Sequence, residues 1–159
     1  MQLKSENQPW RTILLLEDNY EDEVLARRAV EESDTNTSIR VVNSTENALK
    51  LLNLDNSNSA MINNQAFIPD LILISLNHEY SSNIDFIGII KEKLKERRIP
   101  VLILAKLISK SAVQLSYKLN ADAFIQKPQN FNKYKELMSM ISDYYFNLIL
   151  LPDQMPTTG

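Results

Sequence analysis

The sequence PDLILISLN, residues 69–77, contains an uninterrupted apolar run at 71–74. A strand that is apolar on both faces belongs inside a parallel sheet that helices cover on each side. Other runs of this kind occur at 13–16, 39–42, 101–104 and 123–125, and those at 39–42 and 123–125 are weaker. Five parallel strands are therefore expected, with the 39–42 strand nearer an edge of the sheet.

Segments with helical spacing of apolar residues separate these runs. They are residues 21–32, 44–52, 86–98, 112–119 and 131–148. Strand and helix thus alternate five times, which predicts one doubly wound α/β domain with right-handed crossovers. We assign residues 11–150 to this domain and expect terminal tails at 1–10 and 151–159 and an Asn/Ser-rich surface loop at 55–64.

The composition excludes several kinds of chemistry. The chain has 159 residues, enough for one domain, and its net charge of −3 does not favour nucleic acid or anionic lipid. It contains no cysteine, one histidine and two glycines, which argues against thiol catalysis, a histidine-built zinc site, a Ser-His-Asp triad and glycine-rich phosphate loops. No leader segment and no run of about 20 apolar residues is present, so a cytoplasmic protein is expected.

Polar residues at the ends of the predicted strands are candidates for a functional site, because an open parallel sheet binds ligands at the carboxyl ends of its strands. The residues at these ends are Glu17, Asp18, Ser75, Asn77, Ala105, Lys106 and Lys127.

Four segments at these strand ends resemble the motifs of bacterial response regulator receiver domains. They are LLEDN at 15–19, PDLILISLN at 69–77, IPVLILA at 99–105 and AFIQKP at 123–128. The similarity covers about residues 11–150, and it is greatest to the single-domain regulators encoded beside cyanobacterial phytochromes. It implies a flavodoxin-like (βα)5 fold with strand order 2-1-3-4-5. It also implies Mg²⁺-dependent phosphoryl transfer from a sensor histidine kinase to an aspartate at the end of the third strand.

Several positions match the family's site. Glu17 and Asp18 keep its acidic pair, and Lys127 keeps the lysine that pairs with the phosphate. The resemblance assigns Asn77 a backbone carbonyl that completes the metal shell, so its side chain is expected to be unimportant. Glu17, Asp18 and Asn77 would then form a vestigial Mg²⁺ site.

Two positions depart from the family's chemistry. Ser75 stands at the phosphoacceptor position, and a serine hydroxyl is a poor nucleophile unless a general base activates it. Ala105 stands where the family has a hydroxyl residue, and it cannot hydrogen-bond to a phosphoryl group. Lys106, at the rim, is expected to approach Glu17 or Asp18 and to replace the cation.

These departures suggest a pseudo-receiver: a non-catalytic module of two-component (phosphorelay) signalling that acts by protein–protein contact and not as an enzyme. A phytochrome-like sensor histidine kinase or another regulator is the expected partner. No cofactor is expected, and Mg²⁺ is expected to bind weakly at most. Two alternatives remain open. One is a Mg²⁺-dependent phosphoacceptor that uses Ser75 or a displaced acid such as Asp85, and the other is a flavodoxin-like cofactor binder, which would be coloured.

The 131–148 helix has apolar residues beyond the stripe that covers the sheet, and such a helix needs a second partner. In the resembled family this region contributes to homodimerisation. We therefore expect a homodimer interface formed by Phe131, Tyr134, Met140, Tyr144, Phe146 and Ile149. The basic run at 91–98 is interpreted as a solvated helix end that the helix dipole favours.

Overall fold

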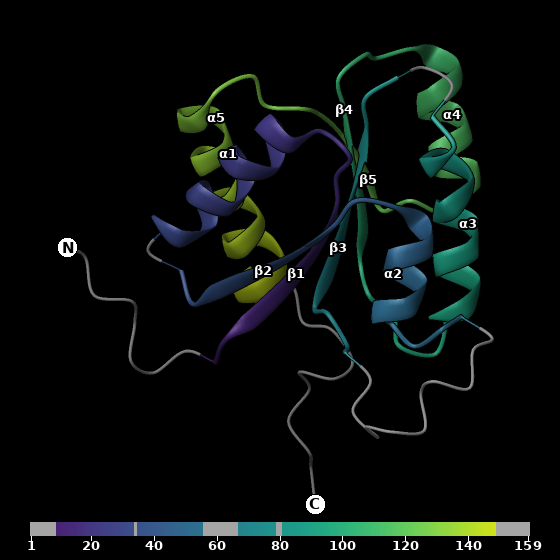
Figure 1. Cartoon of the computed structure of the whole chain (residues 1–159), viewed down its shortest axis with the longest axis horizontal. Coiled ribbons are helices and arrows are strands. Elements are labelled where there is room, and N and C mark those ends of the chain that lie inside the picture. Colours follow the sequence, from purple (N-terminus) through teal and green to yellow (C-terminus); the bar gives the residue numbers. More distant parts are fainter. Residues whose placement is uncertain (1–8, 34, 56–66, 79–80, 149–159) are drawn as a thin grey trace, which may run out of the picture.

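The computed structural model describes residues 9–33, 35–55, 67–78 and 81–148 of the chain. Strands and helices alternate along it (Figure 1): β1 (Arg11–Leu16), α1 (Tyr20–Glu31), β2 (Thr37–Val42), α2 (Thr45–Leu51), β3 (Leu71–Leu76), α3 (Asn83–Lys93), β4 (Val101–Ala105), α4 (Lys110–Lys118), β5 (Ala123–Gln126) and α5 (Phe131–Ile141). The strands are parallel and form one sheet in the order β2-β1-β3-β4-β5. The predicted fold is confirmed, and β2 is an edge strand as expected.

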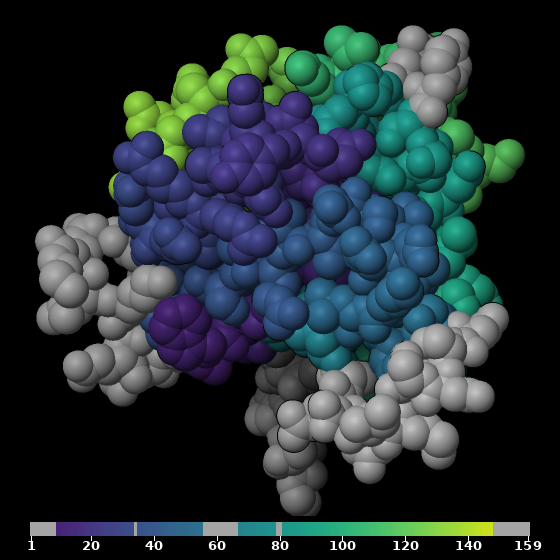
Figure 2. All heavy atoms as spheres, in the orientation of Figure 1, coloured from purple at the N-terminus to yellow at the C-terminus, as the bar shows by residue number. Residues whose placement is uncertain are grey.

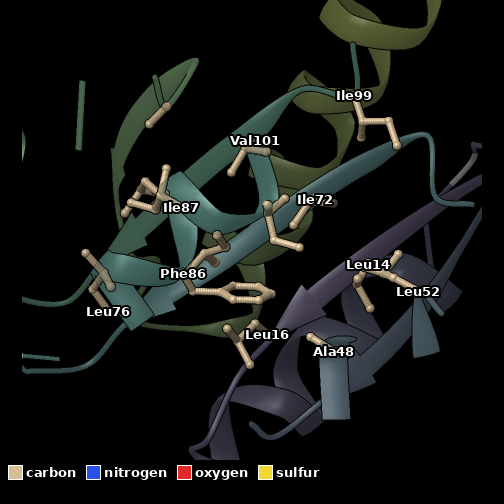
Figure 3. Close-up of a cluster of buried hydrophobic side chains, with 14 of the residues drawn as sticks. Leu14, Leu16, Ala48, Leu52, Ile72, Leu76, Phe86, Ile87, Ile99 and Val101 are labelled. Carbon is tan, nitrogen blue, oxygen red and sulfur yellow. The ribbon is translucent and has the colours of Figure 1, made fainter. Parts of the chain in front are cut away.

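The sheet lies between two helical layers, with α1 and α5 on one face and α2, α3 and α4 on the other (Figure 1). Because successive side chains of a strand point to opposite faces, β1 contributes Ile13 to one core cluster and Leu14 to the other. Figure 3 shows the cluster beneath α2 and α3, where Leu14, Ala48 and Phe86 lie close together. Every residue of β3 is buried, which explains its two-sided apolar sequence.

Helix α1 begins at a capped position that matters for the site. The Asn19 side chain accepts a hydrogen bond from the Asp22 backbone N–H at 3.0 Å, so it satisfies one of the free donors at the helix start. This cap fixes where α1 leaves β1. As a result, Asp18 precedes the helix and Asp22 lies in its first turn.

Helix α5 is shorter than predicted. It ends at Ile141 and continues as a π-helix, Ser142–Leu148, where each turn holds more residues than in an α-helix. The wider turn lets the adjacent residues Tyr145 and Phe146 both pack against the core beneath α1 and α5. The sequence pattern predicted a continuous α-helix and did not reveal this change.

The structure divides the predicted interface residues. Tyr134 is fully buried within the chain, so its assignment to an interface was wrong: this side chain belongs to the core stripe of α5. Phe131 and Phe146 are partly buried against the same core, whereas Met140 and Tyr144 are 64% and 53% exposed. Ile149, the predicted tail at 151–159 and most of the predicted loop and N-terminal tail lie outside the described residues.

In the part of the chain that the structure describes, no helix is long and apolar enough to cross a membrane. The face of the molecule in Figure 2 carries the atoms of α1, β2 and α2 side by side, in violet to blue.

Candidate functional site

The strand order brings the predicted polar residues to one edge of the sheet. Glu17 directly follows β1, and its backbone N–H donates to the Val42 carbonyl at the end of β2, at 2.9 Å. Lys127 directly follows β5, and its N–H donates to the Ala105 carbonyl at 2.8 Å. Asn77 follows β3, which lies between them in the sheet. These backbone hydrogen bonds hold the residues beyond the strand ends in fixed positions.

The Lys127 ammonium is at the centre of this site. Its Nζ lies 2.6 Å from Glu17 Oε2 and 2.7 Å from Asp22 Oδ2. The lysine side chain is 3% exposed, and those of the two acids are 0% and 21% exposed. A buried charge of this kind is tolerated only when it is closely paired. Lys127 is therefore neutralised by residues of the chain itself.

The Asn77 side chain connects the charged groups, so the expectation that only its backbone matters was wrong. Its Nδ2 donates to Glu17 Oε1 at 2.8 Å and also to Asp18 Oδ1. Its Oδ1 accepts a hydrogen bond from the Lys127 ammonium. The Asn77 amide thus donates to both acids and accepts from the lysine. The resemblance did not predict this role, because in the family only the backbone carbonyl at this position is used.

Ser75 belongs to the same cluster. It is fully buried and shares the face of β3 that carries Leu71 and Leu73, toward α1 and α5. Its Oγ donates to Asn77 Oδ1 at 3.4 Å, and its carbonyl accepts from Asn83 Nδ2 at 3.1 Å. The hydroxyl proton is therefore directed at an amide oxygen, which is not a base that could activate the serine.

Ala105 and Lys106 do not join these contacts. The register pairs Ala105 with Leu76, and the Ala105 methyl packs in the core cluster beneath α2 and α3, on the opposite face from Ser75. Lys106 is exposed, and the cation that pairs with Glu17 is Lys127. Asp85 is likewise exposed, in the first turn of α3.

Sequence reasoning missed two residues of the cluster, Asp22 and Tyr134. Asp22 lies in the first turn of α1 and Asp18 precedes the helix, so helical spacing along the sequence does not by itself bring the two acids together. Tyr134 was assigned to the interface, and nothing in the sequence placed its hydroxyl near the acids.

Tyr134 lies close enough to the cluster for the acids to influence its ionisation. Burial raises the pKa of its phenol well above the usual value of 10.0, and the negative charges of Glu17 and Asp22 raise it further. Among the described residues, its hydroxyl has no hydrogen-bond partner. The folded protein therefore keeps this phenol neutral at a pH where an unfolded chain ionises it.

We expect Tyr134→Phe to remove an alkaline loss of stability. Because the folded state binds the phenolic proton more tightly, wild-type stability is unaffected below the unfolded pKa and falls as the pH rises above it. The loss is about 1.4 kcal/mol between pH 9 and 11. Urea unfolding at several pH values measures this loss. Above pH 10, the free energy of unfolding of the variant should exceed that of the wild type. At pH 7, the control condition, the two proteins should differ little. If the free energies of unfolding of the variant and the wild type changed equally with pH, this explanation would be wrong.

The residues present do not fit a divalent cation as they are arranged. Mg²⁺ prefers near-octahedral oxygen ligands that include carboxylates. Both Glu17 oxygens already have partners, Asn77 and Asn19 N–H at Oε1 and Lys127 at Oε2. The Asn77 group that faces Glu17 and Asp18 is the Nδ2 donor, which cannot ligate a cation. Over the described ranges, no three His, Cys, Asp or Glu side chains are grouped so that they could hold a metal together.

The fold and the acid–lysine cluster together define a class. A five-stranded parallel sheet in the order β2-β1-β3-β4-β5, with acids and a lysine at the carboxyl ends of its strands, is the receiver fold of response regulators.

Known proteins point to one group within this class. No protein-family model matches the chain. The response regulator Rcp1 of Synechocystis sp. is 24% identical over 152 residues, which cover 94% of this chain and 99% of Rcp1. The phosphorylated cyanobacterial phytochrome response regulator RcpA has a similar structure, with a TM-score of 0.75 and 26% identity, over 91% of this chain and 99% of RcpA. The Mn(2+)-bound form of Rcp1 is also similar, with a TM-score of 0.71 and 22% identity, over 89% of this chain and 99% of that one.

These likenesses support a response regulator receiver domain of the cyanobacterial phytochrome-associated type. They also support a role in two-component signalling.

Proposed function

We propose that this chain is a non-catalytic receiver-like module of two-component signalling, which acts by protein–protein contact and takes no phosphoryl group at the usual position. One observation carries the proposal. The hydroxyl of Ser75, which the resemblance to receiver domains aligns with the phosphoacceptor, is buried, and Lys127 is already paired with Glu17 and Asp22.

The chemistry of phosphoryl transfer supports this proposal. Transfer needs a nucleophile, a cation for the phosphoryl oxygens and groups that position them. Ser75 donates its hydrogen bond to the Asn77 amide, and Ala105 brings no hydroxyl. An incoming phosphoryl group would have to compete with two carboxylates for Lys127. Any Mg²⁺ would meet Asp18 as the one exposed acid of the pair and would bind weakly.

The proposed partners follow from the relatives and from the exposed surface. Similarity to phytochrome response regulators supports a sensor histidine kinase, or another regulator, as the partner of this module. We also propose that a second copy of the chain is a partner. The exposed side chains of Met140 in α5 and Tyr144 in the following π-helix would take part in this homodimer contact. Sedimentation of the purified chain tests this homodimer.

Incubation with acetyl phosphate and Mg²⁺, followed by intact-mass measurement, tests the absence of phosphorylation. We expect the wild-type mass to remain unchanged, because no activated nucleophile is present. A stoichiometric phosphate adduct would overturn the proposal. In that case Ser75→Ala, Asp85→Asn and Asp22→Asn identify the acceptor, because Ser75 and Asp85 are the alternatives that the sequence leaves open and Asp22 lies 2.7 Å from Lys127. Loss of the adduct on hydroxylamine treatment would distinguish an acyl phosphate from a phosphoserine. A visible absorption band in the purified protein would instead favour the cofactor-binding alternative.

A further inference from the structure

A cavity of about 540 Å³ lies between α3 and α4, at the opposite end of the strands from Ser75. Ile99 and Val101, which precede and begin β4, and Asp122, which precedes β5, line it, so it opens at the amino ends of these strands. Helices α3 and α4 are neighbours on the same face of the sheet (Figure 1). The cavity is therefore separate from the acid–lysine cluster.

The inner part of the cavity is apolar. Its lining includes Leu94, Ile99 and Leu119, together with Gly88 of α3. A Cβ added at Gly88 would lie 3.1 Å from Leu119 Cδ2, which is closer than ordinary van der Waals contact. The absence of a side chain at Gly88 therefore lets Leu119 of the neighbouring segment pack directly against α3.

Positive charge dominates the rim of the cavity. It is lined by four cations and two acids: Lys91, Lys95, Arg98, Lys118, Glu92 and Asp122. Lys91 pairs with Asp122 at 2.8 Å, and Lys95 pairs with Glu92 at 3.2 Å. Within the described ranges, Arg98 and Lys118 have no acidic partner. Two uncompensated cations therefore face the solvent beside an apolar floor.

Arg98 has a backbone conformation that is unusual for a residue with a long side chain. Its φ is 52°, in the left-handed region that is unfavourable for most residues with a Cβ. At the other left-handed positions of the described chain, 53 and 120, the sequence has asparagine, which tolerates this conformation well. At position 98 it has arginine, so a cation is present at a point where the backbone favours a different residue.

A helix dipole accounts for the charge at Lys118 but not for the charge at Arg98. Lys118 is the last residue of α4, where a cation is favoured by the free carbonyls of the helix end. Arg98 lies five residues beyond the end of α3 at Lys93, and the dipole effect fades within the last turn. The interpretation of the whole basic run as a solvated helix end is therefore incomplete.

We propose that this cavity binds a small organic anion. The apolar part of the ligand lies against Gly88, Leu94 and Leu119, and its anionic group is held by Arg98 and Lys118. Charge-assisted hydrogen bonds to an arginine are strong, and they are specific for carboxylate, sulfonate or phosphate geometry. Such a site goes beyond the proposed signalling role, because it would let a ligand act on this module without phosphorylation.

The test uses the full chain and an anionic aromatic probe, 8-anilinonaphthalene-1-sulfonate, followed by its fluorescence. We expect saturable binding at one site. Arg98→Asn and Lys118→Gln should each weaken it about three-fold and together about ten-fold. Asparagine is chosen at 98 because it tolerates the backbone conformation. Lys133→Gln with Lys135→Gln removes the same charge from exposed positions of α5, and this matched control should leave the affinity unchanged.

Amide chemical shifts of the isotope-labelled chain locate the probe independently of the variants. Changes confined to residues 88–99 and 118–122 support the proposal. Changes elsewhere, or equal weakening in the control variant, would overturn it. So would equally tight binding of the uncharged analogue N-phenyl-1-naphthylamine. Competition by a glutamate-rich peptide at similar concentration would assign the cavity to an acidic protein segment and would overturn the small-molecule proposal.

Discussion

Lys127→Met is expected to lower the free energy of unfolding by about 3–5 kcal/mol. The substitution removes the ammonium that lies between Glu17 and Asp22 and leaves two carboxylates close together, one of them completely buried. Removing one member of a buried ion pair is costly because the other charge remains without a partner. Urea unfolding measures the change, and thermal unfolding should show a decrease in Tm of roughly 10 °C.

Two further variants separate this effect from a general loss of packing. Lys133→Met removes an exposed lysine, which lies 3.5 Å from Glu136, and should cost less than about 0.5 kcal/mol. Lys127→Met combined with Glu17→Gln and Asp22→Asn removes all three charges and should recover most of the lost stability. A loss below about 1 kcal/mol in the single variant would mean that water, and not Lys127, neutralises the acids.

Ser75→Asp is expected to make the protein dependent on a divalent cation. The new carboxylate would join Glu17, Asp18 and Asp22 in a cluster with one lysine, at a position that is fully buried. Without metal, we expect a loss of about 3 kcal/mol or more, because a buried charge is added without a partner. Mg²⁺ supplies the missing charge and prefers carboxylate oxygens, so its affinity should rise at least about ten-fold over the wild type, or 1.4 kcal/mol.

Calorimetric titration with Mg²⁺ and thermal unfolding with and without Mg²⁺ measure this change. Ser75→Asn is the matched control, since it has nearly the same shape and no charge. Phosphorylation of Ser75→Asp by acetyl phosphate should remain weak, because Ala105 offers no hydroxyl for the phosphoryl oxygens and its methyl group faces the other core cluster. Unchanged metal affinity in Ser75→Asp would show that Glu17 and Asp18 are not positioned to act with residue 75.

The architecture was readable from the sequence because two-sided burial leaves a strong pattern. The residues of β3 and β4 are all buried, and their apolar runs have no polar interruption at 71–74 and 101–104. The strand order came from the resemblance and not from the pattern itself. The change from α5 to the π-helix was missed because one added residue per turn leaves the apolar composition of the segment unaltered.

The site was only partly predictable. The rule that ligands bind at strand ends found Glu17, Asp18, Ser75 and Lys127, and the structure brings these together. The contribution of the Asn77 side chain depends on which way its amide points, and that orientation is set by neighbours from three strands. The Ala105 methyl faces the other layer because of the register with β3, which spacing along the chain does not specify.

The hydrogen bonds among Glu17, Asp18, Asn77 and Lys127 also constrain how position 75 can change during evolution. A lineage that acquired aspartate at position 75 would first pass through a less stable protein, since the surrounding charges are already balanced without it. Selection for stability alone therefore disfavours an acidic residue at this position.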